Sequence, residues 1–227
     1  MTVTQQSPQP VTVGPPSAQS EEEALAALDR ISAGLVEMAT PQRVLVADSQ
    51  EQREAVYRLR YRVMLDEGWG RPENFPGGME SDEYDGRAFH AMVWDGNEAI
   101  ACSRLVFPEP GLLLPTEEAC GMQIEPRGRV VDGGRTAVLR EYRGRQRILL
   151  AVLGASFQEF RARGGYSFIA SMLTPGMIRL YRHVGMEASI LGPPRLHLGA
   201  ERQPVLFDIT QISRGIGQRF RHLIDQP

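Results

Sequence analysis

The sequence predicts an α/β fold in which one mixed, mostly antiparallel sheet carries helices on both of its faces. Segments with apolar residues at helical spacing are interspersed along the chain with short apolar runs typical of strands. The turn Asp95-Gly96-Asn97 separates two such runs and indicates an antiparallel hairpin. A succession of helix, strand and helix over residues 148–183 adds the α/β character.

The first forty residues differ from the remainder of the chain. Residues 1–20 are rich in Pro, Ser and Gln with few large apolar groups, so we expect a disordered tail. Residues 21–38 predict an amphipathic helix, which either packs on its own domain or docks on a partner. The expected organisation is a tail (1–20), an accessory amphipathic helix (21–40) and one domain (41–227).

The order of the remaining elements follows from the same periodicities and from Gly and Pro positions. A connection over residues 69–84 is long enough to suggest a functional loop. Strands are expected at 43–47, 89–94, 99–107, 129–139, 168–173, 186–191 and 204–209, and helices at 51–66, 148–161, 175–183 and 212–224.

Composition excludes several classes of function. The net charge of −3 gives no general attraction to nucleic acid. The four histidines are scattered and no spacing suits a metal site. No apolar stretch approaches the roughly 20 residues of a membrane helix, and the first residues have neither a basic start nor an apolar run. We therefore expect a cytoplasmic protein without metal or transmembrane segment.

The acidic segment 78–85 is the most informative motif. It holds four carboxylates within six residues, which is usually a solvated loop. Arg60, Arg62 and Arg104 lie in flanking elements and could fold back onto it, and paired carboxylate–arginine contacts have defined geometry. The segment is thus either a solvated loop or part of a site.

Two further segments also have either an ordinary structural role or a role in a site. Gly133 and Gly134 interrupt the strand 129–139, and either form a turn or accompany a bulge that exposes backbone N–H groups to a ligand. Arg143, Gly144 and Arg145 precede the helix at 148–161, where free N–H groups bind phosphate. They are either a phosphate site or a solvated basic helix start.

Together these segments resemble the acyl-homoserine-lactone (autoinducer) synthases and their relatives, the N-acyl amino acid synthases and exosortase-associated acyltransferases, within the acetyltransferase (GNAT) superfamily. The resemblance covers roughly residues 43–210. Asp132 stands where the family has Glu, and Gln146 and Ile148 replace small residues of the superfamily's pyrophosphate loop. The motif residues are matched, in order, by Arg60, Trp69, Asp82, Asp85, Arg104, Asp132 and Arg135.

The resemblance implies a GNAT-like sheet and transfer of an acyl group from a thioester to an amine. Asp132 is the expected base; the rival role for it is an ion pair that orients Arg135. Asp82, Asp85 and Arg104 would complete the catalytic set, and Arg60, Trp69 and Arg135 would bind substrate. Ser171 and Met172 would line an acyl slot, and Arg143, Gly144 and Arg145 would bind the donor's phosphopantetheine.

The resemblance leaves the substrates open. The donor is expected to be an acyl carrier protein, since Gln146 and Ile148 would crowd a pyrophosphate, or else coenzyme A. The acceptor is expected to be a free amino acid, with S-adenosylmethionine, as in autoinducer synthesis, as the alternative. No cofactor is expected to stay bound. A non-catalytic ligand-binding relative is a remote third possibility, prompted by Asp132 and the Gly-Gly pair.

Overall fold

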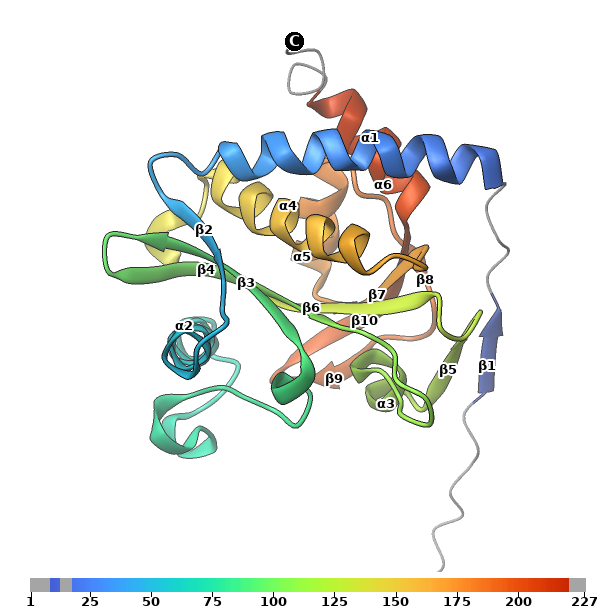
Figure 1. Ribbon diagram of the computed structural model, residues 1–227. Coiled ribbons are helices and arrows are strands. Elements are labelled where there is room, and N and C mark those ends of the chain that lie inside the picture. The colour runs from blue at the N-terminus through green and yellow to red at the C-terminus, as the bar shows by residue number, and fades with distance from the viewer. Residues whose placement is uncertain (1–8, 13–17, 221–227) are drawn as a thin grey trace, which may run out of the picture.

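The computed structural model describes residues 9–12 and 18–220 (Figure 1). Its main feature is one sheet in the order β2-β3-β4-β6-β7-β10-β8, with β9 paired to β10. Every pair in this sheet is antiparallel except β6–β7. The strands are β2 (Arg43–Val46), β3 (Phe89–Asp95), β4 (Glu98–Val106), β6 (Val130–Val138), β7 (Phe168–Leu173), β8 (Ser189–Ile190), β9 (Arg195–His197) and β10 (Ala200–Asp208).

Helices cover both faces of this sheet, as the sequence predicts. Helix α4 packs on β3 and β4 from one face, with α1 outside it, and α2 packs on β4 and β6 from the other (Figure 1). The capping box of Ser49 and Gln52 starts α2. The helices are α1 (Ala18–Glu37), α2 (Gln50–Asp66), α3 (Pro115–Cys120), α4 (Gln146–Arg163), α5 (Pro175–His183) and α6 (Ile209–Arg219).

Helix α1 packs on the rest of the chain through α4 and α6. Leu28, Ile31 and Leu35 are fully buried in the main core. The two helices approach so closely that a Cβ on Gly154 of α4 would lie 2.9 Å from the Ser32 carbonyl oxygen. The long apolar stripe of α1 is therefore buried against its own chain.

Two expectations for the ends of the chain need correction. Part of the predicted tail is ordered: β1 (Gln9–Thr12) pairs in parallel with β5 (Met122–Glu125), and α1 already begins at Ala18. Residues 1–8 and 13–17 lie outside the described residues, as do residues 221–224 of the predicted last helix.

Some elements are shorter than expected or were not predicted. The strand expected at 186–191 is only Ser189–Ile190. Strands β1, β5 and β9 and the six-residue helix α3 have no counterpart among the predictions. Each is too short to show a full hydrophobic period, so the pattern on which the predictions rest is absent.

The parallel pair β6–β7 positions the site. Its register runs from Val130 opposite Phe168 to Asp132 opposite Ala170 and then stops, although both strands continue. The two strands therefore separate beyond Asp132, which opens the middle of the sheet. No helix in the part of the chain that the structure describes is long and apolar enough to cross a membrane.

Candidate active site

A cavity of about 640 Å³ lies where β6 and β7 separate. Its walls come from both strands, from α2, from the start of α4, from α5 and from the β9–β10 hairpin. Most of the predicted site residues line it: Arg60, Trp69, Arg104, Asp132, Arg135, Arg143, Gly144, Arg145, Ser171 and Met172. The site residues predicted from the sequence therefore line one cavity, except for Asp82 and Asp85.

Asp85 is held by Arg60, a buried residue of α2. The Arg60 Nη1 and Nη2 atoms donate to the two carboxylate oxygens of Asp85 at 2.9 and 2.6 Å. Nε and Nη2 also donate to the Glu80 carbonyl at 3.1 and 2.6 Å. Burial acts to raise the pKa of Asp85, but Arg60 and then Arg104 outweigh it and hold that pKa well below its usual range.

Arg104 and Arg135 bind the same acidic loop from the sheet. Arg104 Nη1 lies 2.6 Å from Asp82 and 3.0 Å from Asp85. Arg135 donates to Glu80 at 2.9 Å and to Asp82 at 2.6 Å. The loop is therefore not a solvated acidic run, because three arginines bind its three buried or half-buried carboxylates.

Asp82 and Asp85, which the resemblance places in the catalytic set, do not themselves line the cavity. Asp82 and Asp85 lie behind the cavity wall and orient the arginines that line it. Their spacing is explained by a turn, in which the Asp82 N–H donates to Asp85 at 2.8 Å. The sequence analysis did not single out Glu80, which lines the cavity. It was wrong to expect Arg62 here, since Arg62 pairs with Glu98 and Glu141 at the surface.

Asp132 lies at the point where the strands separate and is almost fully buried. One carboxylate oxygen accepts from the Thr116 N–H at 2.8 Å, in the first turn of α3. Burial raises the pKa of Asp132, which makes its carboxylate a stronger base. Asp132 forms no ion pair with Arg135 within the described chain, so the rival role expected for it is wrong.

Strand β6 is bulged beside Asp132. Two residues, Arg135 and Thr136, stand opposite the single residue Ser103 of β4, and Arg135 has a positive φ of 51°. The strand continues through Gly133 and Gly134, so these glycines do not form a turn. A Cβ on Gly133 would lie 2.7 Å from the Ile169 side chain of β7, so this side chain leaves no room for a larger residue than glycine.

The start of α4 forms one end of the cavity. Arg143, Gly144, Arg145 and Gln146 line it, and no side chain caps the first turn. The Ile148 N–H donates to the Arg145 carbonyl at 2.9 Å, and the N–H groups of Gln146 and Arg147 are available to an anion. The expected crowding by Ile148 is wrong, because this side chain is fully buried in the core.

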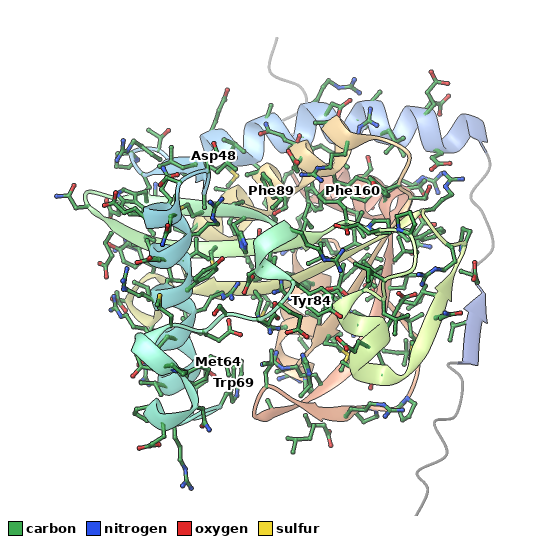
Figure 2. All side chains as sticks on the ribbon, turned by 60° about the horizontal axis from the view of Figure 1, so that its bottom comes forward. Asp48, Met64, Trp69, Tyr84, Phe89 and Phe160 are labelled. Carbon is green, nitrogen blue, oxygen red and sulfur yellow. The ribbon has the colours of Figure 1, made fainter. Side chains whose placement is uncertain are left out.

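The β9–β10 hairpin and the loop after α2 form the wall on another side. The guanidinium carbon of Arg202 lies 4.5 Å from the centre of the Trp69 ring. A Cβ on Gly199 would lie 1.8 Å from the Trp69 carbonyl oxygen, so only glycine fits at this contact. Figure 2 shows Trp69 below Met64 and beside this hairpin.

Two residues of this wall, His197 and Arg202, were not selected from the sequence as site residues. Burial, followed by the charges of Arg135 and Arg202, lowers the pKa of His197 to about 4, so the ring is neutral at physiological pH.

No group of His, Cys, Asp and Glu within the described ranges could hold a metal ion.

Part of the chain resembles a known protein family. Residues 59–153, which include the acidic loop, Asp132 and Arg135, match the family model described as acetyltransferase (GNAT) domain. This part of the chain is similar to a GNAT acetyltransferase domain. No curated protein sequence matches the chain at a significant level.

Several solved structures share the fold of this chain. BjaI, a CoA-dependent acyl-homoserine lactone synthase solved with SAM and isopentyl-CoA, is 20% identical with a TM-score of 0.54, over 78% of this chain and 88% of its own. MesI, also a CoA-dependent acyl-homoserine lactone synthase, is 20% identical with a TM-score of 0.58, over 79% and 95%. FeeM, an N-acyl amino acid synthase, is 12% identical with a TM-score of 0.55, over 77% and 95%.

Proposed function

We propose that the protein is an N-acyltransferase that moves an acyl group from a thioester to the amine of an amino-acid-type acceptor. The observation that carries the proposal is the buried carboxylate of Asp132 at the opening between β6 and β7, beside the bulged edge of β6. A base, backbone N–H donors and a cavity that admits both substrates are the parts that amine acylation needs.

Asp132 takes the proton from the acceptor amine, directly or through a water. An ammonium group has no lone pair for attack, so the amine reacts only after this proton is lost. The attacked carbonyl becomes an oxyanion, and N–H groups of the bulged β6 segment beyond Asp132 would stabilise it. The carbonyl then re-forms as the C–S bond breaks. Of the two protons that the nitrogen loses in becoming an amide, one goes to the leaving thiolate and the other to water. Arg60, Arg104 and Arg135 shape this part of the cavity and are themselves held by the acidic loop.

The donor is an acyl carrier protein or coenzyme A. Both present phosphopantetheine, and its phosphate fits the free start of α4 with Arg143, Gly144 and Arg145. The preference for a carrier protein rested on crowding by Gln146 and Ile148, of which only Gln146 lines the cavity. BjaI and MesI are CoA-dependent, so both donors belong in the assay.

S-adenosylmethionine is the alternative acceptor. BjaI, which shares this fold, was solved with SAM, whereas FeeM is an N-acyl amino acid synthase. Both kinds of acceptor present an amine next to a carboxylate, and they differ in their products. An acylated amino acid stays linear. Acylated S-adenosylmethionine closes to a lactone when its carboxylate displaces methylthioadenosine, so that a C–O bond replaces the C–S bond.

The test is product identification with purified protein. The protein is incubated with matched acyl-carrier-protein and acyl-CoA donors, first with a mixture of amino acids and then with S-adenosylmethionine, and products are identified by mass spectrometry. We expect N-acyl amino acids that depend on protein, donor and acceptor. An acyl lactone would establish the alternative, and transfer to no amine from either donor would contradict the proposed function.

A further inference from the structure

Three arginines are buried in the part of the chain that the structure describes, namely Arg60, Arg104 and Arg202. Arg60 and Arg104 are paired with carboxylates of the acidic loop. Arg202 is only 8% exposed and forms no ion pair with any described residue. It is therefore the one buried arginine of these three that has no carboxylate in contact with it among the described residues.

The geometry of Arg202 presents its guanidinium to the cavity. Nε donates to the His197 carbonyl at 3.0 Å, and the group stacks on the Trp69 ring. Neither Nη atom donates a hydrogen bond to a described residue, and Arg202 lines the cavity. One edge of the planar group is thus fixed and the other is available to a ligand.

The local charges indicate an anionic ligand. Burial, and then the charge of Arg135, lowers the pKa of Arg202 to about 10, so the side chain is still protonated at neutral pH. Glu80 and Asp82 are already bound by Arg135, and Asp132 accepts from Thr116. A buried charge without a partner is costly, so an anion from a ligand would stabilise this wall.

We infer that Arg202 binds the carboxylate of the acceptor, so that the preferred acceptors carry a carboxylate next to the amine that is acylated. This inference rests on the proposed N-acyltransfer. The fixed fork of an arginine matches the two oxygens of a carboxylate. The donor's phosphate has a separate set of groups at the start of α4, whereas Arg202 lies on the Trp69 wall beside Arg135.

The test compares acceptors that differ only in the carboxylate. Amino acids are paired with their carboxamides, and S-adenosylmethionine with its decarboxylated analogue, at a saturating thioester donor. We expect wild-type kcat/KM to favour the acid about 10- to 100-fold, the usual range for hydrogen bonds to a charged group. Arg202→Met should remove most of this preference by lowering kcat/KM for the acid alone, and Arg202→Lys should restore part of it.

Arg195→Met is the matched control. Arg195 is the cross-strand neighbour of Arg202 in the β9–β10 hairpin, but it is exposed and does not line the cavity. This variant should keep the wild-type preference for the acid. Melting temperatures of all three variants show whether each is folded, and Arg202→Lys keeps the charge on the wall if Arg202→Met is too unstable to assay.

Three results would overturn the inference. One is an acid preference that persists in Arg202→Met, and another is a wild-type protein that does not prefer acids. The third is an Arg202→Met variant whose KM for the thioester donor is raised by the same factor with the acid and with the amide acceptor. Arg202 would then bind the donor's phosphate and not the acceptor's carboxylate. If no amine is acylated at all, the proposed function fails, and the carboxylate site is judged by thermal shifts instead. Amino acids but not their amides should raise the wild-type melting temperature, and an equal effect in Arg202→Met would refute the site.

Discussion

At the scale of single residues, the site depends on carboxylates that are bound to buried arginines. Asp85 accepts from Arg60 and Arg104, and Arg60 and Arg104 are among the least exposed residues of the chain. Removing one partner of such a pair leaves the other charge buried and unpaired. The acidic loop should therefore contribute to stability as well as to the shape of the cavity.

We predict that Asp85→Asn lowers the free energy of unfolding by about 3–5 kcal/mol near neutral pH, the usual cost of breaking a buried pair. The pKa of Asp85 is depressed in the folded protein, so its stabilisation is complete above the unfolded value of about 3.9. This stabilisation is lost as the pH falls toward the folded pKa. Urea unfolding from neutral to acidic pH should thus show the two proteins converging at low pH.

Glu54→Gln on α2, the helix that carries the Asp85 partner Arg60, is the control for this prediction. Glu54 pairs with the exposed Arg58, and exposed pairs contribute little. It should leave the unfolding midpoint nearly unchanged at every pH. An Asp85→Asn variant as stable as the wild type at neutral pH would show that the ion pairs do not hold the loop.

At the scale of elements, the cavity wall that holds Trp69 and Arg202 depends on contact between the loop after α2 and the β9–β10 hairpin. Gly199 has a positive φ of 69° and lies directly under the Trp69 carbonyl. This contact places the Trp69 ring over Arg202. A single added methyl group should therefore separate the two elements.

We predict that Gly199→Ala destabilises the protein by about 1–3 kcal/mol, as overpacking typically does. It should also shift the emission of Trp69 to longer wavelength, because the ring loses its packing on Arg202. Fluorescence is measured in a Trp94→Phe background, since the chain has two tryptophans.

Gly86→Ala provides the matched glycine replacement. Gly86 has no atom within 4 Å of an added Cβ and no positive φ, so this variant should match the wild type in stability and emission. If Gly199→Ala also matched the wild type in both measurements, the loop and hairpin would not form a common wall.

At the scale of the whole molecule, α1 belongs to the folded core although it precedes the GNAT match by about twenty residues. Its stripe packs on α4, which in turn covers β3 and β4. The sheet that carries the cavity is therefore supported from one face by two layers of helix (Figure 1).

We predict that Ile31→Ala in α1 lowers the free energy of unfolding by about 2–5 kcal/mol, as for other buried large-to-small changes. Ile31 is fully buried among α1, α4 and α6. Guanidinium unfolding provides the measurement, and Glu22→Ala on the exposed side of α1 should stay close to the wild type. A negligible effect of Ile31→Ala would mean that α1 is a detachable accessory segment.

The sequence is informative about long periodic elements and about charged motifs with fixed spacing. The helices that became α1, α2 and α4, and the hairpin β3–β4, were predicted because their hydrophobic patterns span several turns or alternations. Asp82, Asp85 and Arg104 were selected together, and they do meet.

Other parts of the site have no local signal. The Thr116 N–H reaches Asp132 only because the fold brings the start of α3 beside this residue, and a backbone group has no signature in the sequence. Nothing in the local sequence distinguishes Arg202 from a surface arginine, because its contact with Trp69 depends on how the β9–β10 hairpin folds. Ile148 appeared to crowd a loop because its direction into the core depends on where α4 begins.

The most direct test of the account is the pH dependence of acyl transfer in wild type and Asp132→Asn. The substitution keeps the size of the side chain and removes the proton acceptor, so we predict a loss of about 10²–10⁴-fold in rate near neutral pH. The loss should shrink as the pH rises, because the acceptor amine then loses its proton without help. Because burial raises the pKa of Asp132, the wild-type rate should fall on the acid side at a higher pH than for an ordinary aspartate. A deficit in Asp132→Asn that is the same at every pH, or no deficit at all, would contradict the role of Asp132 as the base.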